Sequence, residues 1–227
     1  MKIFPLQPEI DRKVEEVITT IRHLKSGETS DLIKGSGVVY KKNYGVSLVH
    51  LREMAAGMEK NQELARRLWY REIRETMILA TMLAVVEQMG SDEIEQWGEM
   101  IHTIELSEQM GRNLLNCPSI SEGILVGWLD SHHFYRKYAA AMGFGWRLRF
   151  YPETGFDSCD IVFPLLKKGL EDKRFMRAGG FVLKMAGRFS KENRDAVLFL
   201  IHEWKQDKNI YLRQVAQDAK EEIELFL

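Results

Sequence analysis

The chain has 227 residues and a formal net charge of -1, with 45% hydrophobic and 29% charged residues. This balance is typical of a soluble globular protein and excludes intrinsic disorder and collagen-like repeats. The two cysteines are too few for a disulfide framework and neither belongs to a CxxC pair, so we expect a reduced, cytoplasmic setting and no structural zinc. The N-terminal sequence lacks the apolar core of a signal peptide, and no segment approaches about 18 uninterrupted apolar residues. We therefore expect neither secretion nor membrane insertion.

The predicted elements are almost all helices. Apolar residues recur with a helical period along most of the chain, whereas the best strand candidate, residues 37–40, is too short to found a sheet. In chain order, the pattern predicts helices near residues 8–25, 47–57, 61–70, 72–88, 91–102, 105–116, 119–130, 133–148, 157–170, 173–189, 191–206 and 209–225. We therefore predict an all-α fold.

Several predicted helices share a common beginning, an apolar residue followed by arginine. The four arginines are Arg74, Arg136, Arg177 and Arg213, and the last two intervals between them are 41 and 36 residues. Such a period, with two helices in each unit, is typical of HEAT-like solenoids, whose units stack because none buries its apolar face alone. We therefore predict one HEAT-like α-α superhelix over residues 1–227, in which residues 1–40 form a less regular helical cap.

Three stretches resemble a known family. The sequence YGVSLVHLR at residues 44–52 is similar to the "(F/Y)GV…LR" motif of the bacterial DNA alkylation repair family, the HEAT-like alkylpurine DNA glycosylases. LW and REIR within residues 68–74 resemble its "LW…RE-apolar-Q" stretch, and residues 97–110 resemble its "W…I…W-D-x-x-D" helix pair. Order and spacing agree over residues 40–215. The resemblance implies a C-shaped solenoid whose concave basic face grips duplex DNA.

The resemblance also implies a chemistry. Excision of N3- or N7-alkylated purines requires a carboxylate that stabilises the positive charge developing on the sugar. The family uses the last Asp of its W-D-x-x-D motif, which corresponds to Glu108 here, whereas Ile104 replaces the tryptophan. The family's second aromatic, which contacts the lesion nucleotide, corresponds to Phe181, and its phosphate-gripping arginine to Arg136.

These replacements leave two DNA-directed functions open. Tryptophan gives the strongest cation–π attraction to a cationic base, so its loss at position 104 and its replacement by Phe181 weaken stabilisation of the transition state. Some members of the family bind DNA without glycosylase activity, and this motif resembles theirs. The chain is therefore expected to be either a glycosylase with Glu108 as its catalytic residue or a non-enzymatic binder of distorted or branched DNA.

The distribution of charge independently favours DNA binding. Residues 131–213 contain 16 Lys and Arg against 9 Asp and Glu, whereas the rest of the chain contains 16 against 24. Affinity for DNA comes largely from counterions released when cations neutralise phosphates, so a basic segment favours this partner. Residues 177, 181, 184 and 188 are spaced i, i+4, i+7 and i+11, which places them in one stripe of a helix.

A second stripe is expected on the preceding repeat. Arg136 and Arg147 share a helix face there, with the small residues Ala140 and Gly143 between them, which would let a DNA backbone approach closely. Arginines of helical repeats also bond to neighbouring carbonyls or carboxylates in a purely structural role, and the pattern alone does not separate the two roles.

Duplex DNA is thus the expected partner, and no metal or organic cofactor is implied. The residues expected to contact DNA are Arg136, Arg147, Arg177, Phe181, Lys184 and Arg188. Solenoids also use their concave faces to bind proteins, so a protein-interaction scaffold is the alternative from another class of function.

Overall fold

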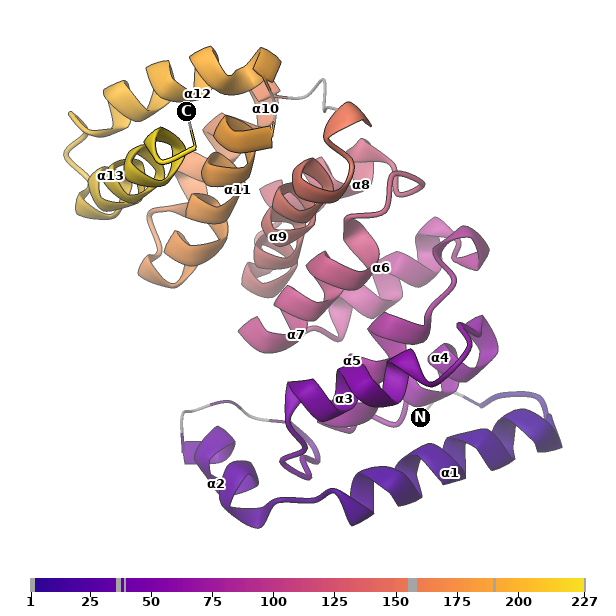
Figure 1. The fold of residues 1–227 in the computed structure, drawn as a ribbon. Helices are drawn as coiled ribbons and strands as arrows, with labels where there is room; N and C mark the ends of the chain where they lie inside the picture. The colour runs from indigo at the N-terminus through magenta and orange to yellow at the C-terminus, as the bar shows by residue number, and fades with distance from the viewer. Residues whose placement is uncertain (1–2, 36–37, 39, 155–158, 190, 227) are drawn as a thin grey trace. The chain divides into compact units, whose positions relative to one another are not determined.

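The computed structural model describes residues 3–35, 38, 40–154, 159–189 and 191–226 (Figure 1). Within these ranges the chain forms 13 α-helices and no β-strand, and a single isolated bridge joins Lys42 to Ile73. The structure is 74% helical. The prediction of an all-α fold is confirmed. The chain divides into two compact units, Met1–Gln109 and Met110–Leu227.

The first unit consists of short helices around a tryptophan core. Its helices are α1 (Pro8–His23), α2 (Gly27–Gly35), α3 (Leu48–Ala56), α4 (Gln62–Trp69), α5 (Arg74–Leu83), α6 (Ser91–Glu99) and α7 (Ile104–Met110), whose last residue begins the second unit. Helix α1 packs against α4, and α5 packs against both α3 and α4. Trp69 and Trp97 are fully buried and stack with ring centroids 4.3 Å apart.

Two features of this unit differ from the sequence prediction. Helix α2 was not predicted, because its sequence carries little apolar periodicity; the side chain of Ser26 accepts a hydrogen bond from the Thr29 amide at its start. The helix predicted over residues 72–88 ends instead at Leu83. The side chain of Gln62 accepts a hydrogen bond from the Val85 backbone amide, and the backbone amide of Asn61 donates to the Leu83 carbonyl. These contacts with the start of α4 end the helix early.

The second unit is a stack of helix pairs. It begins with a π-helical turn (Gly111–Leu115) and continues with α8 (Glu122–Asp130), α9 (Phe134–Phe150), α10 (Cys159–Gly169), α11 (Met176–Phe189), α12 (Lys191–Trp204) and α13 (Ile210–Glu224). A 3-10 turn, Lys173–Phe175, leads directly into α11. Helices α8, α10 and α12 each pair with the helix that follows, and α9, α11 and α13 pack side by side (Figure 1). This is the predicted two-helix repeat.

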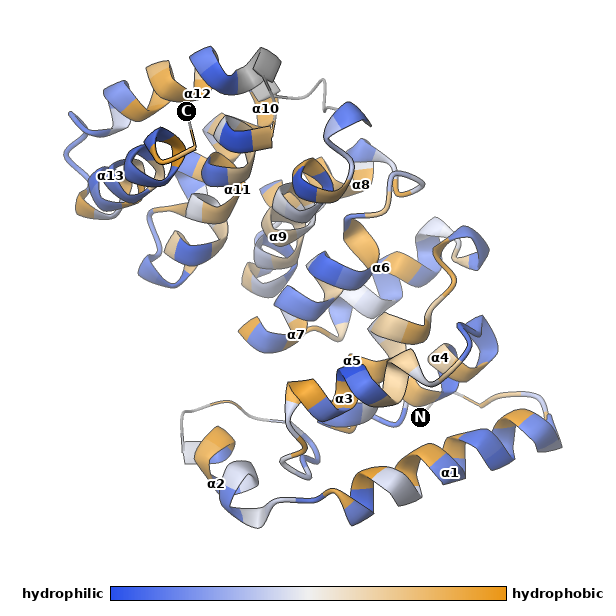
Figure 2. Ribbon diagram, in the orientation of Figure 1, coloured by the Kyte–Doolittle hydropathy of each residue, from blue (hydrophilic) through white to orange (hydrophobic). Residues whose placement is uncertain are grey.

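Amphipathic patterning and small residues hold the stack together. Hydrophobic and hydrophilic residues alternate along α1 and α13, which each bury one face (Figure 2). Gly145 of α9 lies against the ring of Phe181, and Gly187 of α11 lies against Ile223 of α13; a β-carbon at either glycine would overlap that side chain. These glycines therefore allow α9, α11 and α13 to approach closely.

Candidate nucleic-acid interface

A groove of about 390 Å³ lies on the second unit, along α9, α11 and α13. Its charged and aromatic lining consists of Trp146 and Arg149 from α9, Arg177, Phe181, Lys184 and Arg188 from α11, and Asp218 and Glu222 from α13. The structure thus brings together the four residues of the α11 stripe in one groove. Arg177 is exposed, and the other three are half-buried.

Glu222 of α13 forms ion pairs with two of these cations. Its carboxylate lies 2.9 Å from the Lys184 Nζ and 2.9 Å from the Arg188 Nη1. Burial opposes ionisation of Glu222, but the hydrogen bonds and charges of the two cations outweigh it and lower the pKa of its carboxyl group. Glu222 therefore carries a negative charge at neutral pH and offsets part of the groove's positive charge. Sequence reasoning missed this residue because its partners lie more than 30 positions away.

Two aromatic side chains, Trp146 of α9 and Phe181 of α11, line the groove in contact with each other, and we call them the aromatic wall. The Trp146 ring lies 5.0 Å from that of Phe181 and 5.1 Å from that of Phe150, measured between centroids. The Arg112 guanidinium lies 4.4 Å from the Trp146 centroid, and that of Arg149 lies 5.3 Å away. Both distances allow cation–π attraction. The sequence prediction did not include Trp146 or Arg149, whose place beside Phe181 depends on how α9 and α11 pack.

The structure gives Arg147 a structural role, which does not favour its predicted contact with DNA. Only 4% of the residue is exposed. Its guanidinium donates hydrogen bonds to the carbonyls of Leu115, Cys117 and Ile120, at 3.2, 2.7 and 2.9 Å. Burial lowers the pKa of Arg147 below its ordinary value. The Nη2 of Arg147 is thus directed at the turn that precedes α8 and away from the groove.

The remaining residues of the expected second stripe also lie outside the groove. The Arg136 guanidinium lies 4.8 Å from the centroid of the Trp128 ring of α8, and Arg136 does not line the groove. Ala140 and Gly143 are buried, and a β-carbon on Gly143 would come within 2.7 Å of the Leu115 side chain. These small residues thus permit close helix packing, and they do not form a surface for DNA.

Glu108, the expected catalytic residue, lies in the first unit. It is a half-buried residue of α7, the helix that Ile104 begins. Phe181 lies in the second unit, so the expected meeting of Glu108 with Phe181 around a bound sugar stays a prediction.

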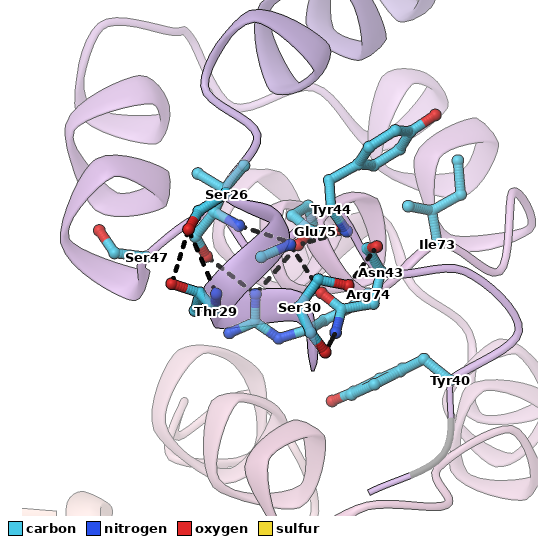
Figure 3. Close-up of polar contacts among 12 residues, drawn as sticks. Ser26, Thr29, Ser30, Tyr40, Asn43, Tyr44, Ser47, Ile73, Arg74 and Glu75 are labelled. Atoms are coloured by element: carbon cyan, nitrogen blue, oxygen red, sulfur yellow. Dashed lines mark hydrogen bonds and ion pairs between the residues drawn. The ribbon is translucent and has the colours of Figure 1, made fainter. Parts of the chain in front are cut away.

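The motifs that carry the family resemblance in the first unit form a buried polar network (Figure 3). The carboxylate of Glu75, which is fully buried, accepts hydrogen bonds from the Tyr44 and Val46 amides. Arg74 pairs with Glu75 and Glu105 and donates to the Val46 carbonyl. Burial opposes ionisation of Arg74, but its two carboxylate partners outweigh that effect and raise its pKa. These motifs therefore join the 44–46 segment to α5 and serve the fold.

In the part of the chain that the structure describes, no helix is both long enough and apolar enough to span a membrane.

Comparison with known proteins identifies the fold. No protein-family model and no curated protein matches the chain. One solved structure matches with a TM-score of 0.77 and 17% sequence identity, covering 93% of this chain and 94% of the other. That structure is described as "A new family of proteins related to the HEAT-like repeat DNA glycosylases with affinity for branched DNA structures". This chain has a HEAT-like repeat fold. The helix pairs α8–α9, α10–α11 and α12–α13 are the repeats, and the groove lies on the second helices of the HEAT-like pairs.

Proposed function

We propose that this HEAT-like repeat protein binds DNA through the groove along α11, without excising bases. The observation that carries the proposal is the convergence of Arg177, Lys184 and Arg188 with the Trp146–Phe181 wall in one groove. The solved protein of similar fold, described as having affinity for branched DNA, supports the same class of partner.

The charge and length of the groove suit a phosphate backbone. Its lining contains four cations, Arg149, Arg177, Lys184 and Arg188, and two carboxylates, Asp218 and Glu222. From Arg177 to Arg188 the α11 stripe extends about 16 Å, since a helix rises about 1.5 Å per residue. Each strand of B-DNA carries one charge about every 3.4 Å along the axis. The stripe is therefore long enough to face several phosphates.

The aromatic wall favours DNA that is distorted or branched. In a regular duplex the bases are stacked and their faces are covered, whereas an unpaired base at a branch exposes a face that aromatic side chains can contact. Trp146 and Phe181 are both half-buried and line the groove beside its cations. We therefore propose branched or locally distorted DNA as the preferred ligand.

Salt dependence tests the proposal. We expect Arg177→Ala, Lys184→Ala and Arg188→Ala each to weaken binding to all DNA sequences alike, because phosphate contacts carry no sequence information. Each substitution that removes a phosphate contact should lower the slope of log affinity against log salt by about 0.9. Equilibrium titrations at several salt concentrations measure both quantities.

Lys220→Ala is the matched control. Lys220 lies on α13, its ammonium is 3.3 Å from Glu224, and it does not line the groove. Its removal should leave the slope unchanged. Equal slopes for the wild type and all three groove variants would contradict the proposal. Absence of DNA binding by the wild type even at low salt would favour a protein-interaction scaffold.

Excision of alkylated purines is the finer function that the family resemblance implies, and it depends on Glu108. We propose binding without excision because Ile104 stands where the family has tryptophan, which removes a cation–π contact to the departing base.

A further inference from the structure

A second basic cleft, of about 560 Å³, lies on the same unit as the groove. Its cations are Lys137 in the first turn of α9, Lys168 near the end of α10, and Lys173 and Arg174 in the 3-10 turn before α11. Tyr211 of α13 also lines the cleft. None of these residues lines the groove along α11, so the cleft is a separate surface.

The cations of the cleft differ in how they are neutralised. Lys168 pairs with Asp130 at 3.2 Å, and Arg174 pairs with Asp172 at 2.6 Å. Among the residues that the structure describes, Lys137 and Lys173 form no ion pair. The cleft therefore contains two ammonium groups that form no ion pair with a carboxylate of the described chain.

The lining of the cleft contains four cations and two carboxylates, Glu171 and Asp172, so positive charge exceeds negative charge there. Lys137 is half-buried, and both its burial and the nearby charge of Lys168 lower its pKa, more strongly than Asp130 and Glu171 raise it. An anion bound beside Lys137 in the cleft would replace its lost solvation and offset its repulsion with Lys168. Phosphate oxygens supply negative charge together with hydrogen-bond acceptors for an ammonium group.

The cleft and the groove are lined by neighbouring residues at the start of α11 and by distant residues of α9. Arg174 in the cleft and Arg177 in the groove are three residues apart, at the start of α11. On α9, by contrast, Lys137 precedes Arg149 by twelve residues, which corresponds to about 18 Å along a helix. The two basic linings are thus close in sequence at the start of α11 and far apart along α9.

We propose that the cleft binds the phosphate backbone of a second DNA arm while the groove along α11 holds the first. This inference rests on the proposed function, because it takes DNA as the ligand of the groove. Arms that diverge from a branch point present phosphates to both surfaces at once. The cleft thereby supplies a preference for branched over linear DNA.

The test compares a four-way junction with a linear duplex of matching arm sequence, using the full-length protein. The double variant Lys137→Gln/Lys173→Gln removes both unpaired ammonium groups. We expect it to bind the junction about tenfold or more weakly and to lose about one to two units of salt slope on the junction. Binding to the linear duplex should change by less than about twofold, because the groove alone holds it.

The matched control is Lys205→Gln/Lys220→Gln, which removes the same charge from half-buried positions of the same unit outside both surfaces. It should affect junction and duplex equally and weakly. Lys173→Gln alone, at an exposed position, should show the same selective loss to a smaller degree if the double variant folds poorly. Circular dichroism establishes that each variant is folded.

Two results would overturn the inference while leaving the proposed function intact: an equal loss on junction and duplex, or no loss on the junction. In either case the Arg177→Ala and Lys184→Ala variants would still weaken binding to both DNAs. If the wild type binds neither DNA, the proposed function fails and the inference fails with it.

Discussion

At the scale of single residues, the partners of an arginine or lysine decide its role. Arg147 and Arg188 both belong to the basic segment, and sequence spacing gave both the same expected contact with DNA. Arg147 donates to three carbonyls inside the unit, whereas Arg188 pairs with one carboxylate at the edge of a groove. A phosphate can compete for the donors of Arg188, whereas the Nη2 of Arg147 is directed away from the groove.

Replacement of Glu222 should strengthen DNA binding. Glu222→Gln keeps the shape of the side chain but removes the charge that pairs with Lys184 and Arg188, so both cations become available to phosphate. We expect affinity for DNA to rise about three- to tenfold at low salt, with a steeper salt slope. Titration of the variant against the same DNA measures both effects, and Glu224→Gln is the matched control on the same helix. Unchanged or weaker binding would show that Glu222 positions the cations for DNA.

Replacement of Arg147 should destabilise the protein. Arg147→Met keeps much of the apolar volume but removes a hydrogen-bond donor from three carbonyls, of which that of Cys117 also accepts a hydrogen bond from the Ile120 backbone amide. We expect the free energy of unfolding to fall by about 2–4 kcal/mol, as for other buried polar groups that lose a charged partner. Denaturant unfolding measures this loss. The folded fraction of the variant should retain the DNA salt slope of the wild type, and a reduced slope would instead return Arg147 to the DNA interface.

At the scale of the helices, the second member of each repeat in the second unit lines the proposed DNA-binding groove. The first unit contains the motifs of the family resemblance. Helix α11 contributes four cation or aromatic residues to the groove, and α9 and α13 flank it. In the first unit, α5 binds the 44–46 segment through Arg74 and Glu75. The residues that carry the resemblance there thus have contacts that stabilise the fold.

Glu108 of helix α7 is the residue through which base excision can be tested. Glu108 is the one residue of α7 that the resemblance makes catalytic, and we expect the wild type to release no N7-methylguanine or N3-methyladenine from alkylated duplex DNA above the spontaneous rate. The reason is the missing tryptophan at position 104. Quantification of freed base is the measurement, and Glu108→Gln is the paired variant, which should bind DNA as well as the wild type. Base release that Glu108→Gln reduces about 100-fold would establish a glycosylase.

At the scale of the whole molecule, charge is distributed unevenly along a nearly neutral chain. Residues 131–213 carry an excess of basic side chains, and the groove and the second cleft both lie in the unit that contains them. Two basic surfaces on one unit suit a ligand with several phosphate backbones. A chain with net charge near zero can therefore still bind a polyanion, because the local field at the groove governs association.

The all-α fold, the helix pairs of the second unit and the α11 stripe could all be predicted from sequence, because they depend on a period of 3.6 residues within one helix. The stripe needs only the spacing of residues 177, 181, 184 and 188 to place them on one face. Helix α2 could not be predicted, because polar contacts between Ser30 and Asn43 join it to the neighbouring loop and its sequence lacks apolar periodicity.

Contacts between helices were decided only by the tertiary structure. The end of α5 at Leu83, the approach of Trp146 to Phe181, and the ion pairs of Glu222 each join residues that are more than 20 positions apart. No local period encodes such pairs, because they depend on which faces pack and how closely. Arg147 shows the consequence: its spacing from Arg136 predicted a shared surface, and the packing of α9 against the turn before α8 buried it instead.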